Sequence, residues 1–237
     1  FRSGDFHYRF LKHEVSEKGI IPTIIEDQLA ARKKTRKEIA HLAQKINEEK
    51  LDDEEVKMIK LRMEVLEERQ KTYKINANSM YGVLGARKGY IPLLPAAMCV
   101  TYVGRQSIKK ASTFIIDHYK GKILYGDTDS CYFSAYRTLR KDIDSGDIPW
   151  NKESVIILYD QIGEEVNSTF PQFMLDTFHC PKTRGEVIKA GREIVGSKSL
   201  FITKKRYAVL YYDKEGKRYD KDGKEGDIKA MGLDLKR

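Results

Sequence analysis

Cysteine is scarce in this chain of 237 residues, which holds only three, at Cys99, Cys131 and Cys180. Their odd number and wide separation exclude a disulfide framework and a cysteine-based zinc site, because both need cysteines in matched sets. We therefore expect an intracellular, reducing compartment.

Long apolar runs are also lacking. No stretch approaches the roughly 20 apolar residues that span a bilayer, and no signal-peptide pattern opens the sequence, so we expect no membrane partner. The sequence starts at Phe1 without an initiator methionine, and it stops at Lys236-Arg237 without a terminal tail segment. We expect the chain to be a piece of a longer polypeptide.

Charge is plentiful and unbalanced. The chain has 44 Lys and Arg against 35 Asp and Glu, a formal net charge of +9. A basic but mixed composition fits a nucleic-acid partner. The length is sufficient to bury a core and predicts one or two domains.

The first third of the sequence predicts two long helices. Thr23 and Glu26 have the capping-box spacing just after Pro22, and Asp52 or Asp53 would cap the second helix. Apolar residues recur three or four apart on a charged background in both. We expect an antiparallel helical hairpin over residues 23–82, entered through a segment over 1–22.

The remainder, residues 83–237, predicts a mixed body. The elements expected there are a helix over 96–119, a hairpin over about 122–134, a surface loop over 137–151, a helix over 154–178 interrupted near Pro171, and strands over about 186–231. The predicted fold class is α+β, with the long helical hairpin projecting from an antiparallel sheet backed by helices.

Two acids mark the first hairpin. Asp127 and Asp129 lie between the apolar pair Ile123-Leu124 and the apolar run that begins at Cys131. This pattern predicts strand, tight turn and strand, with both carboxylates at the turn. Such oxygens suit a hard cation such as Mg²⁺. An ordinary aspartate-containing turn has the same pattern.

One face of the second long helix combines three kinds of polar group. Lys74, Asn78 and Tyr81 are spaced i, i+4 and i+7, so an ammonium, an amide and a phenol share that face. The ammonium can neutralise a phosphate, and the ring can pack against a base or sugar. Gly82 allows a large group to approach the backbone.

Basic residues cluster at two further places. Arg32 and Arg36 lie one helical turn apart and suit a polyphosphate. The segment Lys204-Lys205-Arg206-Tyr207 is expected to begin a strand, with Lys205 and Tyr207 on one side and the other two on the opposite side. Such clusters are also typical of solvated helix faces and protected edge strands.

Three of these segments together resemble a known family. Residues 74–82, 125–130 and 204–207 look like three successive signature motifs of family B DNA polymerases, in the right order and at similar spacing. The resemblance makes 23–82 the fingers and 83–237 the palm. The segments 191–194 and 228–232 lean toward T-even-phage and other viral members.

The resemblance implies a role for each site residue. Asp129, with Asp127 as its companion, would hold two Mg²⁺ ions for nucleotidyl transfer, and Glu193 would lie near them. The other implied contacts are the triphosphate of the incoming nucleotide (Arg32, Arg36, Lys74, Asn78), the nascent base pair (Tyr81) and the DNA primer end (Gly82, Lys204, Lys205, Arg206, Tyr207). The implied activity is template-directed DNA synthesis on primer-template DNA and dNTP, within the host cell of a virus.

The sequence also departs from the family pattern. The first palm motif, which carries another metal-binding aspartate, has no counterpart here, because Asp5 lacks its context; the exonuclease and thumb are likewise missing. One alternative is therefore a polymerase active only with the missing segments. Another is a binding module without catalysis. An RNA polymerase or reverse transcriptase is a more distant third: their palms also pair acids at a hairpin, but Thr128 between the two acids and the motif over 78–82 resemble family B instead.

Overall fold

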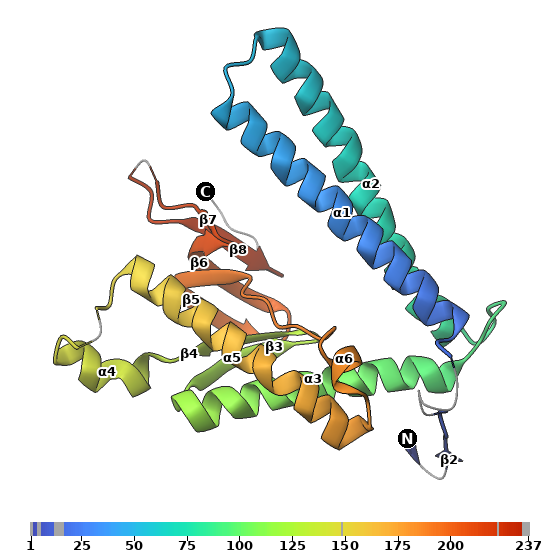
Figure 1. Ribbon diagram of the computed structural model, residues 1–237. Coiled ribbons are helices and arrows are strands. Elements are labelled where there is room, and N and C mark those ends of the chain that lie inside the picture. Colours follow the sequence, from blue (N-terminus) through green and yellow to red (C-terminus); the bar gives the residue numbers. More distant parts are fainter. Residues whose placement is uncertain (1, 4–5, 12–16, 148, 222, 234–237) are drawn as a thin grey trace. The chain divides into compact units, whose positions relative to one another are not determined.

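The computed structural model describes residues 2–3, 6–11, 17–147, 149–221 and 223–233 (Figure 1). The chain forms two compact units, Phe1–Tyr102 and Val103–Arg237, and each is described by itself. Helices and antiparallel sheets are both present, which confirms the α+β class.

The first unit is dominated by a helical hairpin of α1 (Ile20–Glu48) and α2 (Asp53–Gly85), which lie side by side (Figure 1). Two contacts show that the helices run antiparallel. Arg32 Nε donates to Gln70 Oε1 at 3.1 Å, and Arg62 pairs with Glu38 at 2.6 Å further along. The predicted long antiparallel helix pair is therefore confirmed.

The two helices begin differently from one another. The capping box expected at Thr23 is wrong: α1 starts at Ile20, and the Thr23 hydroxyl donates to the carbonyl of Gly19 at 3.0 Å. Pro22 therefore sits in the first turn, where its missing N–H costs no helical hydrogen bond. The cap predicted at Asp52 or Asp53 is confirmed at Asp52, because its side chain accepts from the Glu55 amide at 2.7 Å and completes a capping box.

The short strands β1 (Arg2–Ser3) and β2 (Phe6–His7) pair antiparallel before α1. Asp5, weighed above as a substitute acid, lies outside the described residues. Helix α3 (Leu94–Tyr119) contains the point at which the two units divide.

The second unit contains the remaining elements. They are β3 (Lys122–Asp127), β4 (Ser130–Ser134), α4 (Tyr136–Asp144), α5 (Lys152–Phe178), α6 (Lys182–Gly185), β5 (Ile194–Thr203), β6 (Arg206–Lys214), β7 (Lys217–Arg218) and β8 (Asp227–Met231). Strands β3 and β4 form one antiparallel hairpin. In the other sheet β6 pairs with β5, β7 and β8, all antiparallel.

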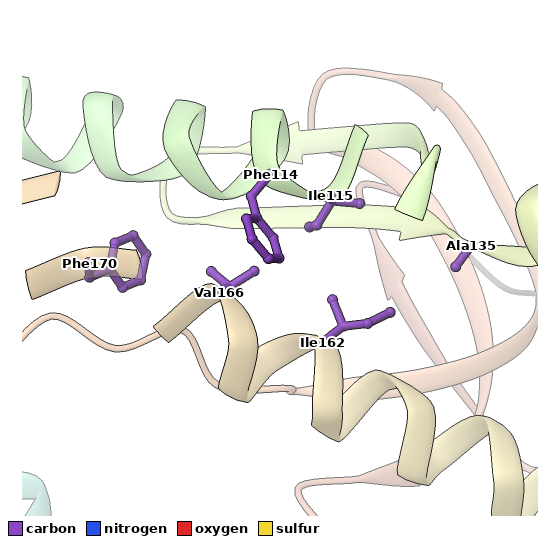
Figure 2. Packing of buried hydrophobic residues seen from close by; sticks show 6 residues of the cluster. All are labelled: Phe114, Ile115, Ala135, Ile162, Val166 and Phe170. Carbon is purple, nitrogen blue, oxygen red and sulfur yellow. The ribbon is translucent and has the colours of Figure 1, made fainter. Parts of the chain in front are cut away.

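The core of the second unit lies between α3 and α5 (Figure 2). Phe114 of α3 faces Ile162, Val166 and Phe170 of α5, and Ala135 closes one end. The three α5 residues are spaced four apart, so they form one apolar stripe. Burial of this stripe holds α5 against the rest of the unit.

Two predictions about the helices of this unit are wrong. Helix α4 occupies most of the expected loop over 137–151, and α5 continues through Pro171 without a break. Buried Phe170 and Met174 lie on either side of that proline, and their packing holds both halves of α5 in place.

The strand expected from Glu186 begins only at Ile194. The reason is the side chain of Asn167, which bonds both the amide and the carbonyl of Ala190, at 2.6 and 2.9 Å. Those backbone groups are then not available for a strand ladder.

In the described part of the chain, no helix combines the length and the apolar character that crossing a membrane requires.

Candidate functional site

The predicted acids lie at the tip of the β3–β4 hairpin. Asp127 pairs with Ser130, which leaves Thr128 and Asp129 as a two-residue loop. We call residues 127–130 the acidic turn. The Ser130 hydroxyl closes it by donating to the carbonyl of Asp127 at 3.1 Å.

The backbone of the acidic turn is strained at Thr128. Its φ is +50°, a left-handed conformation that β-branched residues seldom adopt. Strain of this kind costs on the order of 1–3 kcal/mol and clusters at functional sites. The hydroxyl of Thr128 donates to Asp127 Oδ1 at 3.0 Å and so orients that carboxylate.

The two carboxylates differ in their surroundings. Asp127 is half-buried and held by Thr128, whereas Asp129 is exposed. Their oxygens are the ligand type that Mg²⁺ prefers. Within the described residues, however, no group of three His, Cys, Asp or Glu side chains gathers around one point. The pair fits Mg²⁺ in chemistry but supplies only part of a ligand set.

The basic segment over 204–207 is arranged differently from the prediction. Thr203 pairs with Arg206, so Lys204 and Lys205 form a two-residue turn instead of alternating along a strand. We call residues 203–206 the lysine turn. Both lysines are exposed, and Lys205 adopts a left-handed φ of +60°. The two ammonium groups therefore lie at the tip of a hairpin.

Tyr207, the last residue of the predicted basic segment, is only 4% exposed. Burial, followed by a hydrogen bond with Tyr132 at 3.3 Å between the two hydroxyls, raises the pKa of Tyr207 to about 12. The ring therefore anchors the start of β6 beneath the lysine turn, and its contact with DNA stays a prediction.

The acidic turn and the lysine turn are joined by aromatic side chains. Tyr125, Tyr132, Phe201 and Tyr207 form a cluster in which ring centroids lie 5.2–6.0 Å apart. The Tyr125 hydroxyl also accepts a hydrogen bond from the Lys205 amide at 2.7 Å. The structure thus brings together two predicted segments that lie about 80 residues apart in the sequence.

Sequence reasoning assigned no role to Tyr125 or Tyr132. A signal was available, because Tyr125 opens the same motif that carries Asp127 and Asp129. The role of Tyr125 was not predicted because the two aspartates alone account for a metal-binding turn, with no need for an aromatic residue before them.

Glu193, the third predicted metal neighbour, pairs with Lys229 of β8 at 2.6 Å. Its side chain is about half exposed. Lys229 also received no role from the sequence, although it lies in the segment 228–232 that carried the viral resemblance. The metal role of Glu193 stays a prediction.

The predicted nucleotide-binding residues lie on the helical hairpin of the first unit. Lys74, Asn78 and Tyr81 are exposed on the unbroken helix α2, so the predicted shared face is present. On α1, Arg36 is exposed, while Arg32 is half-buried and bonded to Gln70. Gly82 has open space where a Cβ would lie. The roles of these residues in binding stay predictions.

Comparison with known proteins adds an independent observation. The model of DNA polymerase family B matches residues 2–175. DNA polymerase 037L of Invertebrate iridescent virus 6 is 37% identical over 216 residues, which covers 88% of this chain and 16% of that protein.

Two further relatives are similar over most of this chain. DNA polymerase 120R of Invertebrate iridescent virus 3 is 32% identical over 222 residues, covering 92% of this chain and 17% of the relative. The DNA polymerase delta catalytic subunit of Candida albicans is 31% identical over 226 residues, which covers 92% of this chain and 18% of that protein. The chain therefore spans less than a fifth of the length of each of these relatives.

The iridescent-virus relatives confirm the predicted viral affinity, whereas a T-even-phage lineage stays a prediction. The family match covers most of the chain and includes both the helical hairpin and the acidic turn. The chain therefore belongs to DNA polymerase family B.

Proposed function

We propose that this chain forms the fingers and part of the palm of a DNA-directed DNA polymerase, which extends a primer along a template. The observation that carries the proposal is the joining of the acidic turn to the lysine turn through Tyr125 and Lys205. Carboxylates on one hairpin, joined in this way to a hairpin that carries two ammonium groups, suit a reaction between a primer end and a nucleotide triphosphate. The names of the similar relatives, all DNA polymerases, support it.

In this proposal the acidic turn holds the metal. Asp129 is exposed and able to bind a metal ion. The carboxylate of Asp127 is oriented by its hydrogen bond from the Thr128 hydroxyl. Two Mg²⁺ ions bound there would neutralise charge on the reacting phosphates. Glu193 would lie nearby and stay paired with Lys229.

The basic residues bind the two substrates. Lys205, with Lys204 and Arg206, contacts the phosphates at the primer end, and Tyr207 supports them from below. Arg32, Arg36 and Lys74 hold the triphosphate so that the primer 3′-hydroxyl attacks and pyrophosphate leaves.

The remaining residues of the α2 face complete the nucleotide site. Asn78 supports the triphosphate contacts, Tyr81 lines the pocket of the nascent base pair, and Gly82 leaves room for the DNA. Movement of the helical hairpin on a correct nucleotide would gate the reaction.

The partners follow from this assignment. They are primer-template DNA, dNTP and the polymerase segments that carry the further aspartate and the thumb, in the same or another polypeptide. We place the protein in a reducing, intracellular compartment of a virus-infected host cell, which the three free thiols support.

A second candidate is a binding module that holds DNA or nucleotide without catalysis. The observation in its favour is that no third acid joins Asp127 and Asp129 in the described part of the chain.

Primer extension by the variant Asp129→Asn tests the proposal. The variant is assayed as this chain alone and as this chain combined with the segments that supply the further aspartate. We expect extension to be lost while primer-template binding, measured by fluorescence anisotropy, stays within about twofold, because one exposed carboxylate contributes little to phosphate contacts. The matched control is Asp142→Asn, an exposed carboxylate on α4.

Near-normal extension by Asp129→Asn would contradict the metal-ligand role. DNA binding with no extension by the unmodified chain in either assay would favour the binding module.

A further inference from the structure

We propose that Tyr125 is a positioning residue that sets the distance between the acidic turn and the lysine turn, and thereby aligns the primer end with Asp127 and Asp129. This inference rests on the proposed polymerase function.

The first observation is the hydrogen bond itself. The Tyr125 hydroxyl accepts from the backbone amide of Lys205 at 2.7 Å, a short distance for such a bond. Tyr125 lies two residues before Asp127 on β3, so its Cα is only about 7 Å along the strand from the acidic turn. One side chain therefore connects the metal-binding segment directly to the backbone of the DNA-binding segment.

The second observation is that the Tyr125 ring has little freedom to move. It stacks on Phe201 at 5.2 Å and contacts Tyr207 at 5.3 Å and Tyr132 at 6.0 Å. Phe201 and Tyr207 flank the lysine turn on β5 and β6. Because three rings pack against the Tyr125 ring, the hydroxyl is held at a defined point and its bond to Lys205 sets a defined distance.

The third observation is the conformation of Lys205. Its φ of +60° is uncommon for a residue with a side chain and has to be held by its surroundings. The backbone amide of Lys205 donates the hydrogen bond to Tyr125, so this bond helps to hold the left-handed conformation of Lys205. A phenylalanine at position 125 would fill the cluster equally well, so the hydroxyl contributes orientation of Lys205 and not packing.

The geometry is tested first by hydrogen exchange, measured by NMR on the 237-residue chain. In Tyr125→Phe we expect the Lys205 amide to exchange about five- to tenfold faster, the effect of removing one neutral hydrogen bond. The amide of Val209, within β6, serves as an internal reference and is expected to keep its rate. Unchanged exchange at Lys205 would overturn the proposal.

The matched control is Tyr132→Phe. Tyr132 belongs to the same hairpin and the same aromatic cluster, but its hydroxyl contacts that of Tyr207 at 3.3 Å. We expect this variant to leave the exchange of the Lys205 amide unchanged. An equal acceleration in both variants would mean that loosening of the cluster is responsible, and would overturn the proposal.

The function is tested by primer extension in the active assembly, defined as the one in which the unmodified chain extends a primer, either alone or combined with the segments that supply the further aspartate. For Tyr125→Phe we expect kcat to fall about five- to tenfold, with the Kd for primer-template and the KM for dNTP within about twofold, because a misaligned primer end still binds. Tyr132→Phe is expected to keep kcat.

A normal kcat in Tyr125→Phe would remove the positioning role while leaving the proposed function intact. Extension that survives Asp129→Asn would remove the proposed function, and the positioning role with it.

Discussion

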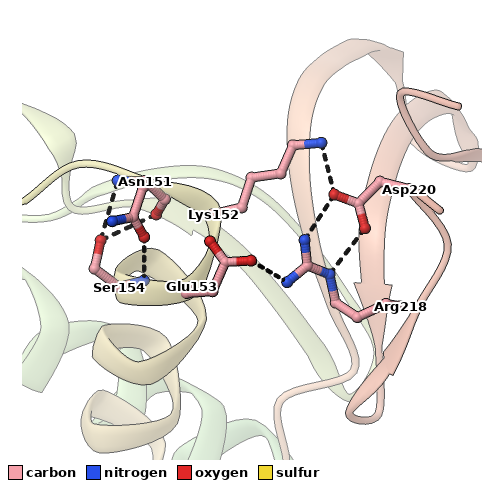
Figure 3. Close-up of polar contacts among 6 residues, drawn as sticks. All are labelled: Asn151, Lys152, Glu153, Ser154, Arg218 and Asp220. Atoms are coloured by element: carbon pink, nitrogen blue, oxygen red, sulfur yellow. Dashed lines mark hydrogen bonds and ion pairs between the residues drawn. The ribbon is translucent and has the colours of Figure 1, made fainter. Parts of the chain in front are cut away.

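Lys152 at the start of α5 lies 2.7 Å from the carboxylate of Asp220, which follows β7 (Figure 3). Arg218 reaches the same carboxylate through two hydrogen bonds, at 2.8 and 2.7 Å, and also pairs with Glu153 at 2.7 Å. The Asp220 side chain is only 6% exposed. This group of charges links the first turn of α5 to the segment around β7, at the edge of the sheet formed by β5, β6, β7 and β8.

The stability of this link is expected to depend on pH. Hydrogen bonds from Arg218, and then from Lys152, hold the pKa of Asp220 well below its ordinary value. Since the folded pKa is lowered, the stabilisation is fully present above the unfolded pKa of about 4 and declines progressively as the pH falls from there toward the much lower folded pKa. We predict that Asp220→Asn lowers the free energy of unfolding at pH 7, and that the gap to the unmodified chain narrows toward pH 3.

Urea unfolding at a series of pH values measures this gap. The control is Asp144→Asn, whose carboxylate forms an exposed pair with Arg140 and is expected to contribute little. A gap for Asp220→Asn that stays constant between pH 7 and pH 3 would contradict the prediction.

The core between α3 and α5 yields a second prediction. Ile162 is only 1% exposed, so Ile162→Ala removes buried methyl groups and leaves a cavity. We expect a loss of about 2–5 kcal/mol in the free energy of unfolding. Ile157→Ala on the same helix, where the side chain is 67% exposed, is expected to change stability by no more than about 0.5 kcal/mol. Equal losses in the two variants would show that Ile162 is not in the core.

Features with a local signal were predicted well from the sequence. The helical hairpin was evident from apolar spacing and the Asp52 cap, and the acidic turn from apolar residues on both sides of Asp127 and Asp129. In both cases the determining residues lie within a few positions of one another, so the pattern alone is sufficient.

Features set by distant contacts were not predicted. Neither Lys204 nor Lys205 is of a residue type common in tight turns, such as glycine, asparagine or aspartate. The hydrogen-bond partner of the Lys205 amide, Tyr125, is 80 positions away. The segment before Ile194 is likewise held out of the sheet by Asn167 of α5. Local propensity could not reveal either contact, because each depends on how α5 and the two sheets pack.

The nucleotide-binding role of Lys74 leads to a third prediction. Lys74 is exposed on α2, and its ammonium is proposed to contact the triphosphate. In the active assembly, Lys74→Ala is expected to raise the KM for dNTP or lower kcat about tenfold or more, the effect of losing a charge-assisted contact, with primer-template affinity little changed.

Steady-state primer extension with varied dNTP measures the effect of Lys74→Ala. The control is Lys60→Ala, exposed on the same helix about 21 Å nearer its start. A loss confined to DNA affinity would contradict the triphosphate role.

The lysine turn gives a fourth prediction, on the salt dependence of DNA binding. If Lys204 contacts a phosphate, Lys204→Ala should weaken primer-template binding and reduce the slope of log K against log salt by about one. Anisotropy titrations between about 50 and 200 mM salt measure that slope. Lys198→Ala is the control, because that ammonium on β5 is paired with Glu225. An unchanged slope in Lys204→Ala would mean that the lysine turn does not touch the DNA backbone.

The two-residue loop of the acidic turn makes this hairpin intolerant of changes in length. Phe133 of β4 packs into the core with α5, whereas its neighbour Tyr132 packs into the aromatic cluster on the other face. Deleting one residue between Asp127 and Ser130 would leave a loop too short to close, so the pairing would slip by one residue and exchange these faces, placing Tyr132 against the core and Phe133 toward Tyr207. Natural variation at this position is therefore expected to proceed by substitution, while insertions accumulate in connections such as the one between α4 and α5.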